Sequence, residues 1–258
     1  MKNTLTAGVL LIGNELLSGS IQDKNLAHIA ITLEQRGIRV RETRIVPDIE
    51  DEIVDALNQL RKKFDYVFTT GGIGPTHDDI TSDSIAKAFG VENVLVQEVY
   101  DTINNYLQQK GVEFTPAAQR MAHAPEGAKM VKTEHSIVPA YRIENVFVMA
   151  GVPSIMRIML DNIVKELKTG MTILSNTVHA NVGEGEIAAA LEAIQLKNQD
   201  IDIGSYPQDK NSTFSDYRVI FVVRGTDQNE VDEACDKILT ACHQGNYEAI
   251  RVNKKANN

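Results

Sequence analysis

The sequence predicts an α/β protein with a doubly wound, mostly parallel sheet, followed by a small α+β domain. Three observations predict this fold class. Short apolar runs alternate with amphipathic helical stretches in the first two thirds of the chain, as in strands joined by crossover helices. The first run, residues 6–12, is apolar throughout, which favours a strand covered on both faces. After Gly170 the pattern changes to a compact set of strands and helices.

The elements of the first predicted domain, residues 1–168, follow from hydrophobic spacing. Strands begin where apolar residues run together or alternate, and helices where they recur every three or four residues. Gly37 and the Lys168–Thr169–Gly170 segment supply stop signals. The predicted order is strand 6–12, helix 26–33, a more exposed strand 38–46, helix 49–60, strand 66–70, a helix opening at 81–83, one or two helices within 97–123, strand 145–149 and a helix through Leu167.

The second predicted domain covers residues 171–250. Its predicted elements are a strand at 171–178, a helix at 186–196, strands at 201–206 and 217–224, and a helix at 229–244. This β-α-β-β-α order resembles a KH-like domain. An RNA-binding KH domain needs a Gly-x-x-Gly loop that faces a phosphate backbone. The candidate segment Gly183–Glu184–Gly185–Glu186 has a different spacing and a negative charge, so we expect an interface or a substrate-covering domain.

Composition excludes several function classes. The 258-residue chain has a net charge of −9 and no basic stripe, which argues against a nucleic-acid partner. The apolar run at residues 9–12 is too short to span a bilayer, so we expect a cytoplasmic protein without membrane contact. Cys235 and Cys242 lie seven residues apart in a predicted helix, about 10 Å along its axis, which is too far for a disulfide.

The most informative segment is a glycine-rich loop between a predicted strand and a predicted helix. Its sequence is Gly71–Gly72–Ile73–Gly74–Pro75–Thr76–His77–Asp78–Asp79–Ile80. Glycines let a ligand approach the backbone N–H groups, and a helix N-terminus favours anions. Two carboxylates beside such an anion site indicate a divalent metal between them and a phosphate. A strand-to-helix turn with an Asp N-cap is the alternative, and Asp78 in particular could ligate the metal or cap the helix.

Two further loops supply candidate residues. Glu15 lies in an otherwise apolar segment, where a carboxylate is costly unless it is paired, hydrogen-bonded or metal-bound. Asp48 follows the second strand and could act in the site, cap the next helix, or do both. Ser18 and Thr76 carry hydroxyl groups suited to phosphate oxygens. Because loops at the carboxyl ends of parallel strands form the ligand crevice of such sheets, the three acidic loops should converge.

These motifs resemble a known family. The glycine loop, with Gly13–Asn14–Glu15–Leu16–Leu17–Ser18–Gly19 and the downstream Asp23 and Asn25, is similar to the molybdopterin-binding (MoaB/MogA-like) domain in the form of the CinA N-terminal family and of eukaryotic FAD synthetases. The resemblance implies a three-layer sandwich over about residues 5–165. It also implies metal or ligand-activating roles for Asp79 and Asp48, metal binding by Asp78, and ligand contacts from Gly13, Glu15, Ser18, Gly71, Gly72, Gly74, Pro75 and Thr76.

The chain departs from the family in two places. The third family loop, G-T-A-P-G, is replaced by Ser136–Ile137–Val138–Pro139–Ala140, which puts a backbone contact to the ligand in doubt. The later P-G-V-P-x-E is replaced by Ala150–Gly151–Val152–Pro153–Ser154–Ile155. The resemblance includes no counterpart of the CinA deamidase domain, so that activity is not expected.

Three functions remain open at this stage. The first is a metal-dependent pyrophosphatase (with Mg, Mn or Co) that acts on ADP-ribose or a related dinucleotide, as the resemblance implies. The second is a protein that binds or adenylylates molybdopterin. The third is a non-catalytic binding module, against which the four acidic residues Glu15, Asp48, Asp78 and Asp79 argue. The expected partners are a small phosphorylated nucleotide or pterin and further copies of the chain, as a homodimer in preference to a trimer.

Overall fold

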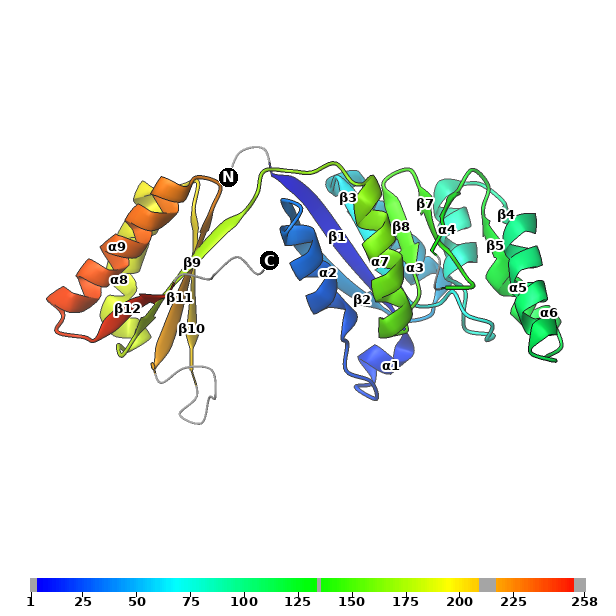
Figure 1. Ribbon diagram of the computed structural model, residues 1–258, viewed down its shortest axis with the longest axis horizontal. Helices are drawn as coiled ribbons and strands as arrows, with labels where there is room; N and C mark the ends of the chain where they lie inside the picture. The colour runs from blue at the N-terminus through cyan, green and yellow to red at the C-terminus, as the bar shows by residue number, and fades with distance from the viewer. Residues whose placement is uncertain (1–3, 134–135, 209–216, 253–258) are drawn as a thin grey trace. The chain divides into compact units, whose positions relative to one another are not determined.

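The computed structural model describes residues 4–133, 136–208 and 217–252, and it divides the chain into two compact units. The N-terminal unit is Leu5–Gly170, and the C-terminal unit is Met171–Asn258 together with Met1–Thr4. Figure 1 shows each unit with its own sheet and its own helices. The two units are described separately below.

A six-stranded sheet forms the centre of the N-terminal unit (Figure 1). Its first four strands in space are parallel, the fifth pairs antiparallel with the fourth, and the sixth pairs antiparallel with the fifth. In spatial order the strands are β2 (Ile38–Val46), β1 (Leu5–Ile12), β3 (Tyr66–Thr70), β8 (Val146–Met149), β7 (Ala140–Ile143) and β6 (Lys129–Val131). The predicted mostly parallel sheet is therefore confirmed.

Helices cover both faces of this sheet. Helices α2 (Asn25–Glu34) and α7 (Pro153–Glu166) pack on one face, and α3 (Glu50–Lys63) and α4 (Thr81–Phe89) pack on the other. Side chains of β1 pack on both faces of the sheet, because Val9 and Leu11 belong to one hydrophobic cluster and Leu10 and Ile12 belong to the other. This alternation explains the continuous apolar run of β1, since each face of the strand is buried. The unit is a three-layer, doubly wound α/β fold.

Small elements extend this unit beyond β7. Strands β4 (Asn93–Leu95) and β5 (His123–Pro125) form a separate two-stranded sheet, and α5 (Gln97–Gln109) packs in a small cluster around Val99, Ile103 and Ala122. The remaining short pieces are α1 (Asn14–Leu17), α6 (Pro116–Gln119) and the 3-10 helix η1 (Arg120–Ala122). The sequence did not predict β4 to β7. Each has only three or four residues, which is too short for hydrophobic periodicity to show.

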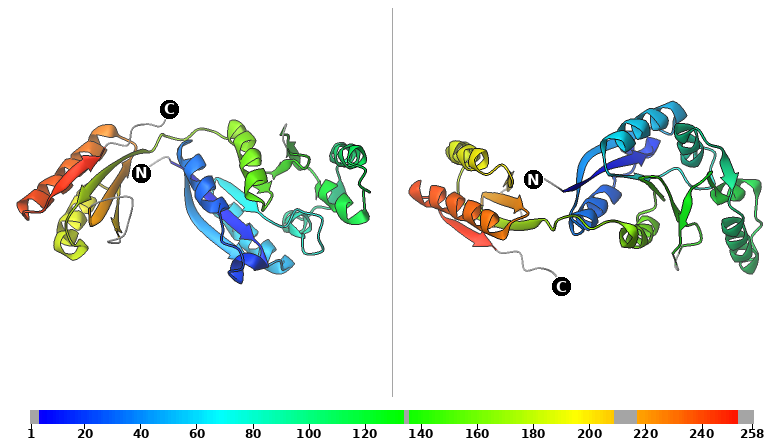
Figure 2. Two further views of the ribbon diagram at one scale, coloured as in Figure 1. Left: turned by 60° about the horizontal axis from the view of Figure 1, so that its bottom comes forward. Right: turned by 90° about the horizontal axis from the view of Figure 1, so that it is seen from above.

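The C-terminal unit is a four-stranded antiparallel sheet with two helices (Figure 2). Along the chain its elements are β9 (Leu174–Ala180), α8 (Glu184–Lys197), β10 (Asp202–Pro207), β11 (Val219–Gly225), α9 (Gln228–Gln244) and β12 (Ala249–Val252). The spatial order is β10-β11-β9-β12. Alternate residues of β11 (Val219, Phe221 and Val223) join the core with both helices.

Strand β12 adds a sixth element to the predicted β-α-β-β-α order. It pairs with β9, so the unit has the β-α-β-β-α-β order of a ferredoxin-like split β-α-β arrangement. The first strand begins at Leu174 rather than at Met171. Cys235 and Cys242 are free thiols buried in this core, which agrees with the expectation that they form no disulfide with each other.

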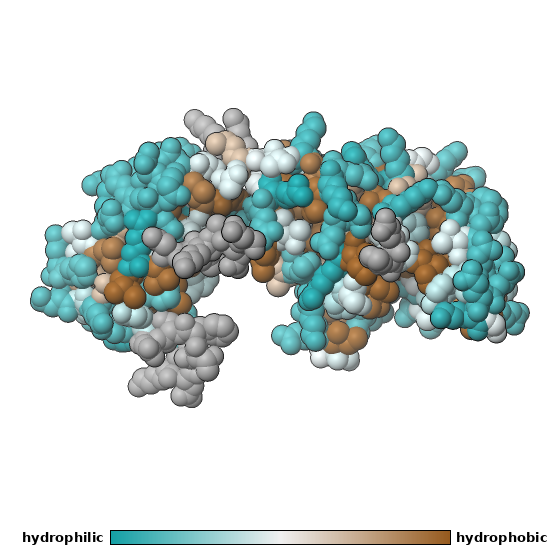
Figure 3. All heavy atoms as spheres, viewed as in Figure 1, coloured by the Kyte–Doolittle hydropathy of each residue, from teal (hydrophilic) through white to brown (hydrophobic). Residues whose placement is uncertain are grey.

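On the face shown in Figure 3, hydrophobic residues lie in several separate groups among hydrophilic ones. Within residues 4–133, 136–208 and 217–252, none of the helices combines the length and the apolar character needed to cross a membrane.

Candidate functional site

The candidate site lies where the strand order of the N-terminal sheet reverses. The chain passes from β1 to β2 on one side and then crosses to β3 on the other side of β1. Such a switch point opens a crevice beyond the carboxyl ends of the strands. A cleft of about 610 Å³ is present there. Its lining includes Glu15, Asp48, Asp78 and Asp79, so the predicted acidic loops do converge.

Two glycines of the loop are required by its close packing. Gly71 has φ +102°, and a Cβ atom there would lie 2.1 Å from the Ile12 carbonyl oxygen. Gly72 has φ +67°, and a Cβ atom there would lie 2.2 Å from the Thr81 hydroxyl. Both φ values belong to the region that favours glycine. The loop therefore lies directly against the end of β1 and the start of α4.

Asp79 is held inside the glycine loop rather than at a helix cap. Its carboxylate accepts hydrogen bonds from the Thr76 backbone N–H at 2.7 Å and from the Thr76 hydroxyl. Helix α4 has Ile80 at its N-cap with no side-chain capping bond, so neither Asp78 nor Asp79 caps it. The capping alternative is therefore wrong for both residues. The Thr76 hydroxyl, which we expected to suit phosphate oxygens, bonds to Asp79 instead.

Asp78 is exposed beside Asp79 and lines the same cleft. The nearby Thr76 hydroxyl, and then the backbone N–H of Asp78 itself, lower the pKa of the Asp78 carboxyl, although the one proton of that hydroxyl bonds to Asp79. The nearby His77 acts in the same direction on this pKa. Because the carboxylate is exposed and charged near neutral pH, it is available to a cation. Pro75 and Gly74 also line the cleft, and a Cβ atom at Gly74 would lie 2.6 Å from the Asp79 carboxylate.

Asp48 joins two loops instead of capping α3. Helix α3 begins at Glu50 with Ile49 at its N-cap and no side-chain capping bond, so the capping alternative for Asp48 is wrong. One carboxylate oxygen of Asp48 accepts a hydrogen bond from the Asn14 backbone N–H at 2.8 Å. This contact ties the loop after β2 to the loop after β1. Asp48 also lines the cleft.

The loop after β1 differs from the prediction in two respects. Glu15 is exposed, so the argument that burial makes its charge costly is wrong. Its carboxylate lies close to Gly13, where a Cβ atom would be 2.3 Å from a Glu15 oxygen. Ser18 does not belong to the cleft lining, and its hydroxyl bonds to the Glu15 carbonyl at 3.2 Å and to the Ser20 hydroxyl at 2.8 Å. Gly13 does line the cleft.

Asn25 is a site residue whose contact the sequence could not show. It is 5% exposed, and its side-chain NH₂ donates to the Gly151 carbonyl at 2.8 Å. A Cβ atom at Gly151 would lie 3.2 Å from the Gly71 Cα atom, so this glycine packs directly on the glycine loop. Asp23 accepts hydrogen bonds from the backbone N–H groups of Asn25 and Leu26, which orders the start of α2. The motif around Asp23 thus fixes one wall of the cleft.

The two segments that depart from the family pattern both reach the cleft. Ser136 and Val138 line it from the loop before β7. Ala150, Gly151, Val152, Pro153 and Ile155 line it from the loop and helix after β8. Apolar side chains in these segments give the cleft a hydrophobic wall.

The fit of a metal ion can be judged from the carboxylates. Within the part of the chain that the structure describes, no three His, Cys, Asp or Glu side chains are close enough together to hold a metal ion by themselves. Mg²⁺ in nucleotide sites is usually held by one or two carboxylates and by substrate phosphates. The exposed Asp78 and its neighbour Asp79 line the cleft from the same loop. They therefore fit a metal ion that is held by two carboxylates together with substrate phosphates.

Comparison with known proteins identifies the family. The model of the probable molybdopterin binding domain matches residues 8–169, which is more than half of the chain. The chain belongs to this molybdopterin-binding domain family. The model of the FAD synthase middle domain matches residues 172–249, which lie in the C-terminal unit.

Relatives of the family agree with this assignment. A protein of Archaeoglobus fulgidus is 33% identical over 200 residues, which cover 78% of this chain and 85% of that protein. A CinA-like protein of Desulfosudis oleivorans is 37% identical over 161 residues, or 61% of this chain and 39% of that protein. The chain thus matches about two fifths of that CinA-like protein.

A solved structure supports the family fold. The crystal structure of the protein CinA, with unknown function, from Thermoplasma acidophilum superposes with a TM-score of 0.57 and 29% sequence identity. The match covers 62% of this chain and 96% of that one. The MoaB/MogA-like, CinA-type fold expected from the motifs is therefore confirmed.

Proposed function

We propose that the cleft binds a phosphorylated nucleotide and that the chain is a metal-dependent pyrophosphatase acting on ADP-ribose or a related dinucleotide. One observation carries the proposal: a glycine loop and the carboxylates of Asp48, Asp78 and Asp79 line a single cleft. A backbone loop suits phosphate oxygens, and acidic residues beside a phosphate require a cation. The cleft volume of about 610 Å³ lies in the range of small-molecule sites.

Each residue has a proposed role in the reaction, in which water cleaves the P–O–P bridge of ADP-ribose to give AMP and ribose 5-phosphate. Asp78 and Asp79 hold the divalent metal, which when bound neutralises charge as the P–O bond breaks. Thr76 orients Asp79 through its two hydrogen bonds. Asp48, fixed by Asn14, accepts a proton from the attacking water through its other oxygen.

A substrate panel tests this function. ADP-ribose, FAD, NAD and ATP are incubated with the full chain and with Mg²⁺, Mn²⁺ or Co²⁺, and the released phosphate esters are separated by chromatography. We expect hydrolysis of ADP-ribose or a related dinucleotide only when metal is present. Hydrolysis that persists after exhaustive chelation contradicts the metal role, and absence of hydrolysis over the whole panel contradicts the pyrophosphatase proposal.

The second candidate function is binding or adenylylation of molybdopterin. The family match and the hydrophobic wall of the cleft favour it, since a planar pterin ring suits apolar side chains such as Val138, Val152 and Ile155. Tight pterin binding, with pterin-dependent release of pyrophosphate from ATP and an inactive dinucleotide panel, would establish it. Ligand binding without turnover in either assay would instead identify a binding module.

A further inference from the structure

A second cavity adjoins the glycine loop and shares part of its lining with the main cleft. It has a volume of about 220 Å³ and lies between the loop, the first turn of α4, strand β5 and Tyr141 of β7. The two cavities share the loop residues Gly72, Ile73, Gly74 and Asp79. None of the motifs found in the sequence assigned a role to this cavity. The glycine loop therefore lines two cavities.

The size of the second cavity suits one part of a ligand. Complete small-molecule sites usually measure about 300–1,000 Å³. The main cleft falls within that range and the second cavity falls below it. A ligand with its phosphates at the glycine loop would be able to place one substituent in each cavity. The second cavity would then hold a single compact group.

The lining of the cavity indicates the chemistry of that group. Val96, Val99 and Met130 give it apolar walls, which suit the faces of a flat ring. The Asp83 carboxylate accepts a hydrogen bond from the Asn93 NH₂ at 2.7 Å, and the Ser82 hydroxyl bonds to the Tyr141 hydroxyl at 3.0 Å. Asp83 is exposed and keeps acceptor capacity, so the polar edge favours a group that donates hydrogen bonds.

A cation lies where this cavity meets the loop. The Arg120 guanidinium donates to the Thr76 carbonyl at 3.3 Å, and Arg120 lines the second cavity. A phosphate attached to the group in the cavity would therefore meet a positive charge at the rim. An apolar slot, an acceptor edge and a cation at the rim together match an amino-substituted base on a phosphorylated sugar.

We propose that the second cavity binds the adenine ring of a nucleotide whose phosphates lie at the glycine loop, with Asp83 accepting a hydrogen bond from the exocyclic amine. The inference deepens the proposed function and rests on it for the position of the phosphates. It assigns the adenylate half of the substrate to the cavity and leaves the main cleft to the other half. Asp83 is then the residue that distinguishes adenine from hypoxanthine, which carries a carbonyl oxygen in place of the amine.

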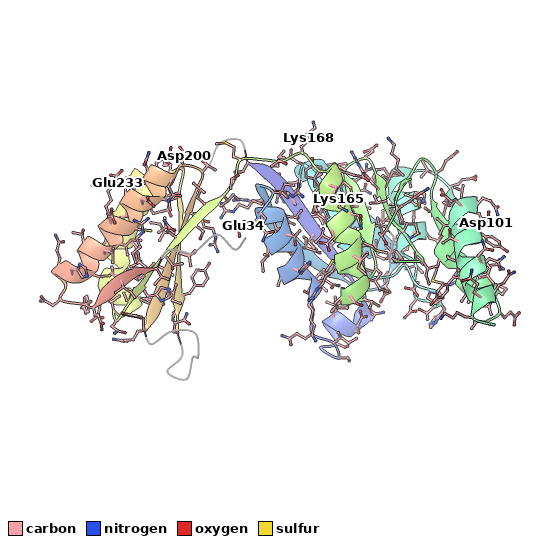
Figure 4. All side chains as sticks on the ribbon, in the orientation of Figure 1. Glu34, Asp101, Lys165, Lys168, Asp200 and Glu233 are labelled. Atoms are coloured by element: carbon pink, nitrogen blue, oxygen red, sulfur yellow. The ribbon has the colours of Figure 1, made fainter. Side chains whose placement is uncertain are left out.

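Binding measurements test the inference without requiring turnover. AMP, IMP and ribose 5-phosphate are titrated calorimetrically into the full chain and into the variants Asp83→Asn and Asp101→Asn. Asp101 is a matched control, because it is an exposed aspartate on α5 that also accepts one side-chain amide hydrogen bond, from Gln97 at 2.8 Å (Figure 4). Circular dichroism melting checks that both variants remain folded.

We expect the unaltered chain to bind AMP at least 10-fold more tightly than IMP and to bind ribose 5-phosphate more weakly than either. Asp83→Asn should reduce the AMP-to-IMP preference to about 1, because an amide donates as well as accepts, and should leave ribose 5-phosphate binding unchanged. Asp101→Asn should keep the preference.

Equal binding of AMP and ribose 5-phosphate by the unaltered chain, or equal effects of the two substitutions, would overturn the assignment. A Ser82→Phe variant that folds but binds AMP normally would also overturn it, because the new ring would fill the cavity. If no dinucleotide is hydrolysed while Asp83→Asn still abolishes the preference for AMP, the proposed function fails and the adenine site stands.

Discussion

Gly71 is the residue whose backbone conformation matters most for the candidate site. Its φ of +102° and its close approach to the Ile12 carbonyl let the glycine loop lie against the end of β1. Gly151 also packs on Gly71 and is held by Asn25. One residue without a side chain thus lets three loops meet at the cleft.

The substitution Gly71→Ala should therefore destabilise the N-terminal unit strongly. The matched control is Gly111→Ala, which also has a positive φ (+67°) but has no heavy atom within 4 Å of the added Cβ position. Gly111→Ala should lower the free energy of unfolding by about 1 kcal/mol, the penalty for a left-handed backbone conformation. Gly71→Ala should lower it clearly more, because backbone atoms must move. Urea unfolding measures both, and equal losses would contradict the packing argument.

The substitution Asp79→Asn tests the catalytic role at the same scale. The amide oxygen can still accept from Thr76, so the free energy of unfolding should change little. If Asp79 holds the metal, kcat/KM on the active dinucleotide should fall about 100-fold or more, equivalent to roughly 3 kcal/mol of transition-state stabilisation. The control Asp101→Asn should retain activity. Near-normal turnover by Asp79→Asn would refute its catalytic role.

At the residue scale the sequence predicted the place of the site better than its contacts. The glycines and acidic residues marked the loops that line the cleft, because these residue types have few structural reasons to occur together. Glu15 is exposed, and the Ser18 hydroxyl bonds to the Glu15 carbonyl. The sequence did not predict either environment, because neighbouring residue types alone do not determine which side chains are buried. The Asn25–Gly151 contact joins residues 126 positions apart and leaves no local pattern.

At the scale of elements, the start of α4 is fixed by the glycine loop. The Thr81 backbone N–H donates to the Gly72 carbonyl at 2.9 Å, and its fully buried hydroxyl donates to the Gly71 carbonyl at 2.9 Å. These two bonds serve in place of a side-chain N-cap, which α4 lacks. These bonds fix the start of α4 against the glycine loop, and residues of both line the second cavity.

The substitution Thr81→Val should weaken the attachment of α4 to the glycine loop and destabilise the N-terminal unit. It keeps the side-chain shape but removes the donor to Gly71, and leaving that carbonyl unpaired costs about 1–3 kcal/mol. Thr102→Val is the control, because the exposed Thr102 hydroxyl bonds to a carbonyl within its own helix. Thr102→Val should lower the free energy of unfolding by no more than about 0.5 kcal/mol. Chemical denaturation gives both values. A smaller loss for Thr81→Val than for Thr102→Val would contradict this role.

Long elements were predictable and short ones were not. Strands β1, β3 and β8 are buried runs, and helices α2, α3 and α7 have clear apolar faces, so periodicity indicated each of them. Strands β4 to β7 and β12 are stabilised by pairing with partners, and nothing local in three or four residues reveals a partner. The open alternative that Asp48 and Asp79 cap the helices that follow them is wrong, because Asp48 bonds to the Asn14 backbone N–H at the start of α1 and Asp79 bonds to Thr76 of its own loop.

At the scale of the whole molecule, each unit has its own hydrophobic core. The described core residues of the N-terminal unit form three clusters within residues 5–167, and those of the C-terminal unit form one cluster within residues 174–249. No described cluster mixes the two units. Since a separate core is the physical requirement for independent folding, residues 1–168 and 171–250 should behave as separate domains.

A fragment that ends at Gly170 should therefore fold alone. We expect its amide NMR spectrum to overlay on the corresponding signals of the full chain and its thermal unfolding to remain cooperative. Calorimetry of the full chain should need two transitions rather than one. A fragment that is unfolded in solution, or a full chain that melts in a single two-state transition, would show that the units depend on each other.

The position of β2 has a consequence for how the protein behaves when concentrated. This nine-residue strand forms the outer margin of the six-stranded sheet and pairs with β1. A long strand at a sheet margin can template the addition of another chain, and charged side chains discourage it. Four charged residues, Arg39, Arg41, Glu42 and Arg44, occur along β2. Replacing them with threonine should leave the folded core intact and yet turn a well-behaved solution into one that precipitates or forms fibrils.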